Sequence, residues 1–151
     1  MKKLVLALVL AGAVSSAYAL DLGIVGTTDV VNGQGATRNG FGINVTQHFT
    51  HGLSLTGEYD RQTKTGLNKW DLIGGYDVTK IGAATLTAKA GLAYVDPAQG
   101  QTGYAGLVGA GVTLPVTQNV SATADYRYQY GQDRVKFDNG NSVLVGLKYT
   151  F

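Results

Sequence analysis

Apolar and polar residues alternate along most of this chain with a period of two. Among the last ten residues, every second position is apolar or aromatic: Val143, Val145, Leu147, Tyr149 and Phe151. The positions between them are mostly small or polar. Successive side chains of a β-strand point to opposite faces, so this pattern predicts a strand with one apolar face and one polar face.

The same alternation recurs between turn-forming residues, and it predicts eight strands. They span approximately residues 21–31, 40–49, 53–61, 69–78, 84–95, 103–114, 119–131 and 142–151. Each has about the length that a tilted strand needs to cross a bilayer. The connections alternate in length. They are short near residues 50–52, 79–83 and 115–118, and longer near residues 31–39, 62–68, 96–102 and 132–141, where Gly, Asn, Asp and Gln suit turns.

The apolar phase of these segments contains no charged residue within the predicted spans. A Lys or Arg that faces lipid at mid-bilayer costs about 2–4 kcal/mol, so a lipid-facing surface should lack charge. Aromatic residues of this phase fall in two groups, as expected of rings at the two headgroup levels. The group near the long connections is Phe41, Tyr59, Trp70, Tyr94, Tyr104, Tyr128 and Tyr130, and the group near the short turns is Phe49, Tyr76, Tyr149 and Phe151.

These observations predict an all-β fold: an eight-stranded antiparallel up-and-down transmembrane β-barrel. Long connections would lie at one end and tight turns at the other, as in outer-membrane barrels. The alternative is a soluble barrel whose apolar phase points inward. That core would have to satisfy the hydroxyls of all eight tyrosines that follow residue 19.

The opposite phase of the strands is polar, with many glycines, and predicts a charged interior. An eight-stranded barrel has room inside for side chains and not for an open pore. Buried charges must be paired, so we expect ion pairs between acidic and basic residues of this phase. The predicted network is Glu58, Asp71, Lys89, Asp125, Arg127 and Lys148. A narrow, selective channel is the alternative interpretation of the same residues.

The N-terminus has the layout of a secretory signal peptide. Lys2 and Lys3 precede an apolar run, and Ala17-Tyr18-Ala19 resembles a cleavage site. We therefore predict a signal peptide over residues 1–19 and a barrel over residues 20–151. Without the two lysines the basic count falls from 12 to 10, equal to the 10 acidic residues. Nucleic-acid binding has no electrostatic support, and the chain has no Cys for disulfides.

With its terminal strand Val143–Phe151 and its eight alternating segments, the chain resembles the small eight-stranded outer-membrane β-barrels. This family includes the OmpA transmembrane domain and the OmpX- and NspA-like proteins. The resemblance identifies Val143, Val145, Leu147, Tyr149 and Phe151 as a C-terminal signature for insertion. It also implies export to the bacterial outer membrane, contact with its lipid and with the assembly machinery, and a monomer.

Few residues suggest chemistry. His48 and His51 flank the first short turn and are expected to be wall and turn residues, a poor metal site. We expect no catalytic residue, cofactor or metal site, although a lipid A-modifying enzyme is a less favoured alternative. The predicted role is structural or surface interaction: envelope integrity, adhesion or lipopolysaccharide contact. Candidate contacts to lipopolysaccharide phosphates are Arg38, Arg61, Lys64, Lys69, Arg134 and Lys136.

Overall fold

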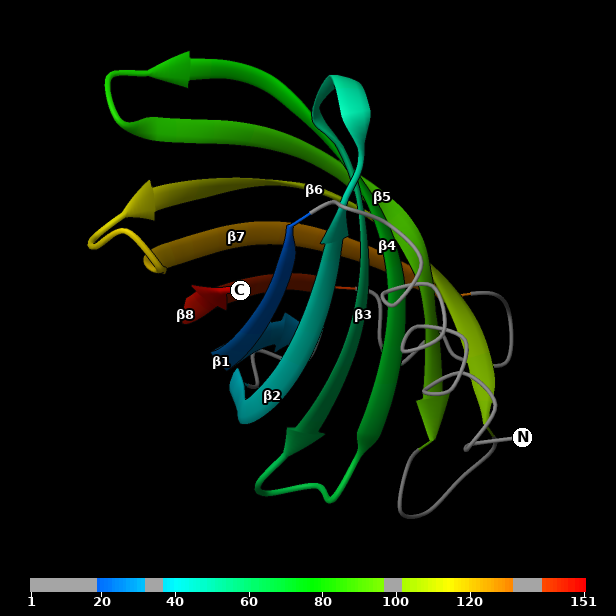
Figure 1. Cartoon of the computed structure of the whole chain (residues 1–151). Helices are drawn as coiled ribbons and strands as arrows, with labels where there is room; N and C mark the ends of the chain where they lie inside the picture. Colours follow the sequence, from blue (N-terminus) through cyan, green and yellow to red (C-terminus); the bar gives the residue numbers. More distant parts are fainter. Residues whose placement is uncertain (1–18, 32–36, 97–101, 132–139) are drawn as a thin grey trace.

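The structure is a computed structural model that describes residues 19–31, 37–96, 102–131 and 140–151 (Figure 1). The predicted signal peptide lies outside these residues except for Ala19. The described part folds into eight strands and one short 3-10 turn. They are β1 (Leu20–Val31), β2 (Thr37–His48), η1 (Thr50–Gly52), β3 (Leu53–Gln62), β4 (Asn68–Ile81), β5 (Ala84–Asp96), β6 (Gly103–Pro115), β7 (Val120–Gly131) and β8 (Gly140–Thr150).

The strands form a closed barrel in sequence order, and every neighbouring pair is antiparallel. Pairing of β1 with β8, from Asp21 opposite Thr150 to Val31 opposite Gly140, closes the sheet. Closure leaves no unpaired edge, and this confirms the predicted fold class. Within the described ranges, no helix is long and apolar enough to cross a membrane.

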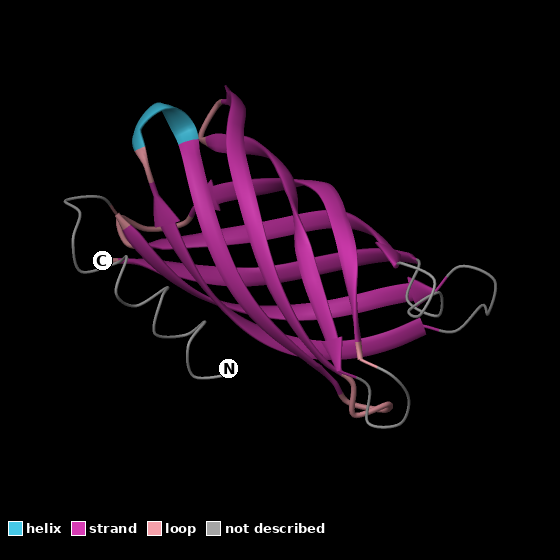
Figure 2. Ribbon diagram, turned by 90° about the vertical axis from the view of Figure 1, so that its right-hand side faces the viewer, coloured by secondary structure: helices cyan, strands magenta, loops and turns pink. Residues whose placement is uncertain are grey.

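The two ends of the barrel differ (Figure 2). The short-turn end carries the connections 49–52, 82–83 and 116–119, and the connection 63–67 lies at the opposite, long-loop end. Strand β4 is longer than predicted, because a register shift between Asp77 and Thr79 lets it continue to Ile81. A tight turn with Gly82 at φ 61° then leads into β5, and glycine adopts this left-handed backbone without strain.

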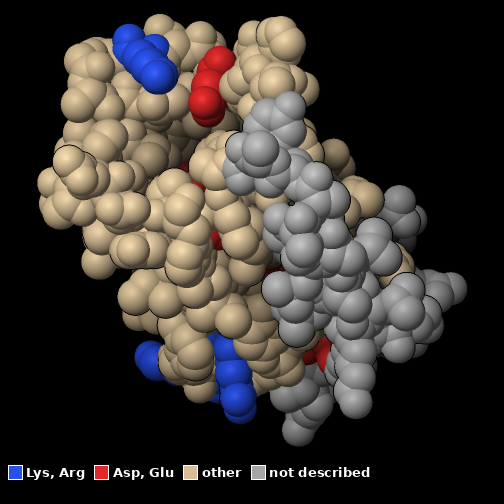
Figure 3. All heavy atoms as spheres, in the orientation of Figure 1, with Lys and Arg blue, Asp and Glu red and all other residues tan. Residues whose placement is uncertain are grey.

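The two faces of the sheet follow the predicted phases. Large apolar side chains of the outward phase are exposed, among them Leu22, Ile24, Phe41, Ile43, Leu72, Tyr104, Val145 and Leu147. Exposed charged side chains of the described strands are Arg61 and Lys80, each next to the last residue of its strand. On the face shown in Figure 3, Lys and Arg lie toward the upper and lower ends, and only small areas of Asp and Glu are visible between them. The outward face is therefore apolar between its ends.

The interior is only partly polar, which corrects the expectation of a polar core. A group of buried apolar residues packs together along the inner side of β4, β5 and β6. We call it the apolar sector, and it consists of Leu67, Ile73, Ala93, Val95, Ala105 and Leu107. The alternation that places Leu72 and Val108 outward also places Ile73 and Leu107 inward, but the prediction for the interior considered only its charged and polar residues.

Candidate functional site

The buried charged residues of the lumen are the candidate functional site. The strand register places long side chains opposite glycines: Lys89 pairs with Gly75 and Gly109, and Arg127 also pairs with Gly109. Asp125 likewise lies opposite Gly111. A Cβ at Gly111 would lie 2.1 Å from Asp125 Oδ1, so the missing side chain is what leaves space for the carboxylate.

Arg127 lies at the centre of this network. Its guanidinium donates two hydrogen bonds to Glu58, with Nη1–Oε1 at 2.5 Å and Nη2–Oε2 at 3.1 Å. Nη2 also donates to Asp125 Oδ2 at 2.9 Å, and Asn44 Nδ2 donates to Glu58 Oε2 at 3.2 Å. Arg127 is on β7 and Glu58 on β3, four strands apart in the order of the closed barrel. This fork therefore crosses the lumen from wall to wall.

Lys89 extends the network on the side of β5. Its Nζ donates to both oxygens of Asp125, at 2.7 and 2.6 Å. Asp125 thus accepts from a lysine and an arginine, and Glu58 from an arginine and an amide. The predicted grouping of Glu58, Lys89, Asp125 and Arg127 in one network agrees with these contacts, and charge-assisted pairs of this kind are the strong ones.

Lys69 requires a correction. It was predicted to contact lipopolysaccharide at the long-loop end, but it belongs to β4 and is buried, 5% exposed. Its Nζ lies 3.4 Å from Asp60 Oδ2 and 3.4 Å from Asp71 Oδ2. Arg127 Nη1 lies 3.6 Å from the same oxygen of Asp71. Lys69 is therefore part of the lumen network and cannot contact lipopolysaccharide. The alternation that places Trp70 outward and Asp71 inward also places Lys69 inward, so only its position next to a long connection favoured a loop contact.

Lys148 also has a different partner from the one expected. It lies near the short-turn end, where its Nζ is 3.9 Å from Asp21 Oδ2. Asp21 accepts a hydrogen bond from Thr150 Oγ1 at 2.7 Å and lies 2.7 Å from His48 Nε2. This second group, the seam cluster of Asp21, His48, Lys148 and Thr150, joins β1 to both of its neighbours. The sequence analysis did not single out Asp21.

The second histidine takes no part in the seam cluster. His51 is exposed in η1 and has φ 64°, a left-handed conformation uncommon for residues other than glycine. The two histidines thus differ, because His48 is a wall residue paired with Asp21 and His51 is a turn residue.

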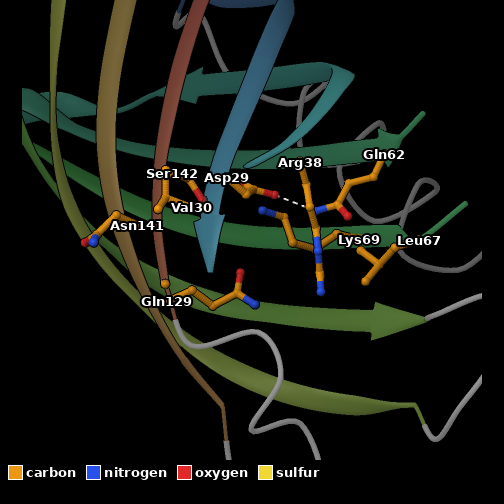
Figure 4. A pocket seen from close by; sticks show the side chains of 10 residues that line it. Asp29, Val30, Arg38, Gln62, Leu67, Lys69, Gln129, Asn141 and Ser142 are labelled. Carbon is orange, nitrogen blue, oxygen red and sulfur yellow. Dashed lines mark hydrogen bonds between the residues drawn. The ribbon is translucent and has the colours of Figure 1, made fainter. Parts of the chain in front are cut away.

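The long-loop mouth contains a small cavity of about 20 Å³, enough for about one water molecule (Figure 4). Gln62 donates a hydrogen bond to Asp29 there, with Nε2–Oδ2 at 2.5 Å. Arg38 and Lys69 also line this cavity. Among the other predicted lipopolysaccharide contacts, Arg61 and Lys64 are exposed, whereas Arg134 and Lys136 lie outside the described residues.

The predicted aromatic groups lie on the outer surface near the two ends. At the long-loop end, the rings of Tyr59 and Trp70 are 4.5 Å apart between centroids. At the short-turn end, Tyr149 and Phe151 are 4.9 Å apart. Tyr59 donates its hydroxyl to Asn68 Oδ1 at 2.7 Å, so the polar tip of an outward ring finds a partner near the strand end. Aromatic rings with a polar group are typical of the boundary between an apolar region and water.

No protein-family model and no curated protein matches this chain. Solved structures do match. The N-terminal β-barrel domain of Pseudomonas aeruginosa OprF is 20% identical with a TM-score of 0.69, covering 87% of this chain and 97% of that one. Neisserial surface protein A is 21% identical with a TM-score of 0.65, covering 90% and 98%. Yersinia pestis Ail is 14% identical with a TM-score of 0.59, covering 89% and 99%. The chain therefore has the fold of the small eight-stranded outer-membrane barrels.

Proposed function

We propose that this chain is an integral β-barrel protein of the bacterial outer membrane, with a non-enzymatic, structural or surface-interaction role. This proposal is based on the contrast between the outward and inward faces of the closed barrel. The outward face is apolar between its ends, and the charges are buried and paired inside. A closed barrel satisfies its backbone hydrogen bonds internally, as a segment in hydrocarbon must. The fold shared with OprF, neisserial surface protein A and Ail supports this proposal.

Membrane residence is tested by fractionation and by gel migration. We expect the chain in the outer-membrane fraction, released by detergent and not by salt. We also expect the unheated protein to migrate differently from the boiled protein in sodium dodecyl sulfate, because a closed barrel resists unfolding until heated. A monomer that stays soluble without detergent would overturn the proposal.

The lumen favours a structural barrel over a channel. The Arg127–Glu58 fork reaches across the full width of the interior, and an eight-stranded barrel has little further space. We expect no steady current from the purified barrel in planar bilayers. A steady conductance that changes in the Glu58→Gln variant would instead favour the narrow channel.

A surface role would begin at the long-loop end. Arg61 and Lys64 are exposed there and could pair with lipopolysaccharide phosphates. We expect the double variant Arg61→Gln/Lys64→Gln to bind lipopolysaccharide more weakly than the wild type, at low salt most clearly. Lys80→Gln is the matched control, because Lys80 is exposed near the opposite end of the barrel. Equal binding by all three proteins would contradict this role.

The remaining alternative to a non-enzymatic role is an enzyme that modifies lipid A. We expect overexpression to leave the mass spectrum of lipid A unchanged. A new lipid A species that depends on His48 would overturn the non-enzymatic assignment.

A further inference from the structure

Three buried carboxylates lie together in the lumen, on the neighbouring strands β3 and β4. Each of Glu58, Asp60 and Asp71 offers an oxygen, and these oxygens all lie within 4.8 Å of one another. Their residues are 3%, 3% and 4% exposed. Register explains the gathering, since Glu58 pairs directly with Asp71 and Asp60 with Lys69. Like charges this close in a buried site are costly unless compensated.

The surrounding side chains do not fully balance the negative charge of the three carboxylates. Lys69 and Arg127 are the cations next to the three acids. With Asp125 and Lys89 included, the network holds four carboxylates and three cations, so its formal charge is −4 + 3 = −1. At the mouth, Asp29 and Arg38 line the same cavity and add one charge of each sign, and Asn44 on β2 is a neutral donor. The network as described lacks one positive charge.

Carboxylate oxygens without a hydrogen-bond partner mark the place where the network lacks a positive charge. Neither oxygen of Asp60 or of Asp71 has a hydrogen-bond partner in the described part of the chain, although all four are buried. Lys69 lies at 3.4 Å from the Oδ2 atoms only. Both Oδ1 atoms are therefore left for another group. Glu58, in contrast, already accepts from Arg127 and Asn44.

We propose that Glu58, Asp60 and Asp71 bind one monovalent metal cation, with Na⁺ as the ion to test. Carboxylate oxygens are the ligands that hard cations prefer. Oxygens that share an ion at about 2.3–2.6 Å lie up to about 5 Å apart, which matches the spacing of this cluster. A single positive charge brings the network to neutrality. A divalent ion would leave an excess positive charge beside Lys69 and Arg127.

The cavity at the long-loop mouth borders the cluster without containing it. Lys69, the cation next to the cluster, lines this cavity together with Gln62 and Asp29 (Figure 4), whereas Glu58, Asp60 and Asp71 do not. Asp29 Oδ1 is also buried without a hydrogen-bond partner among the described residues. The cavity of about 20 Å³ admits a small ion or a water molecule but not a quaternary ammonium ion.

The test uses the full chain refolded in detergent micelles and unfolded with urea, in NaCl or in choline chloride of equal ionic strength. A ligand that binds only the folded barrel stabilises it as its concentration rises above Kd. We expect the unfolding equilibrium constant to fall up to about tenfold per tenfold rise in NaCl beyond that point, and not in choline chloride.

Two variants complete the test. Asp60→Asn keeps the shape and removes the surplus negative charge, so it should abolish the difference between the two salts. Asp77→Asn is the control, because Asp77 is a strand carboxylate outside the cluster that accepts from Thr87 Oγ1 at 2.8 Å, and it should keep the difference. If Asp60→Asn does not fold, Asp71→Asn replaces it.

Three outcomes would overturn the proposal. The first is equal stability of the wild type in the two salts. The second is a sodium dependence that survives in both cluster variants. The third is an infrared band of a protonated carboxylic acid in the wild type at neutral pH in NaCl, absent from Asp60→Asn, because a proton would then supply the missing charge.

Discussion

The inner and outer faces of the barrel differ most clearly along a single strand. On β7, Asp125, Arg127 and Gln129 are buried in the lumen, while Tyr126 and Tyr130 on alternate positions are exposed. One face carries charge and the other does not. The difference lies in partners, since Arg127 reaches carboxylates from two other strands across a narrow lumen. In the proposed membrane placement, an outward charge at the same height would face hydrocarbon. Charge is therefore tolerated where the fold supplies an opposite charge.

Removing Arg127 should have the largest effect. The Arg127→Ala variant leaves Glu58 without its fork and Asp125 with Lys89 alone. Breaking a buried pair by removing one partner costs about 3–5 kcal/mol. Urea unfolding of the refolded barrel measures this loss. The double variant Glu58→Gln/Arg127→Gln should recover part of it, because it removes one charge of each sign. A double variant less stable than Arg127→Ala would contradict the pairing argument.

A charge on the outward face should have the next largest effect. Val145 is 61% exposed in the middle of β8. The Val145→Lys variant places an ammonium on the lipid-facing surface, at a cost of about 2–4 kcal/mol in a bilayer. Unfolding measured in lipid vesicles should reveal this cost, with Val145→Leu as the control. A lysine variant as stable as the leucine variant would argue against lipid contact at this position.

The seam cluster should matter less than the central network. Asp21→Asn weakens the contacts to His48, Thr150 and Lys148 that join β1 to its neighbours. His48 is 37% exposed in its side chain, so solvent screens part of the interaction. We expect a loss of about 1–2 kcal/mol in urea unfolding. A loss as large as that of Arg127→Ala would make the seam, and not the lumen centre, the stabilising region.

The apolar sector should respond least and without dependence on salt. Ile73 is 2% exposed and packs in this sector. Ile73→Val removes one methylene and should cost about 0.5–1.5 kcal/mol. Since no charge is left unpaired, the loss should be the same at low and high ionic strength. Urea unfolding at two salt concentrations checks this, and a salt-dependent loss would show that the apolar sector is coupled to the charged network.

The strands and their two phases could be predicted from the sequence, because a period of two specifies both the extended backbone and the face of each side chain. The closed barrel was predicted from the number of strands together with the uncharged outward phase. The sequence also determined which residues face inward along the middle of each strand, such as Glu58, Lys89 and Arg127. The outward direction of the aromatic residues was predicted from the same alternation.

Which inward residues meet could not be predicted from the sequence. Pairing across the lumen depends on the register of strands far apart in the chain, which no local pattern contains. Lys69 was misplaced because its position beside a long connection suggested an outer loop, whereas the alternation of Lys69, Trp70 and Asp71 places it inward. The partner of Lys148 is Asp21, 127 positions away (148 − 21), and closure of β8 onto β1 brings the two together. The grouping of Glu58, Asp60 and Asp71 likewise results from the register of β3 and β4.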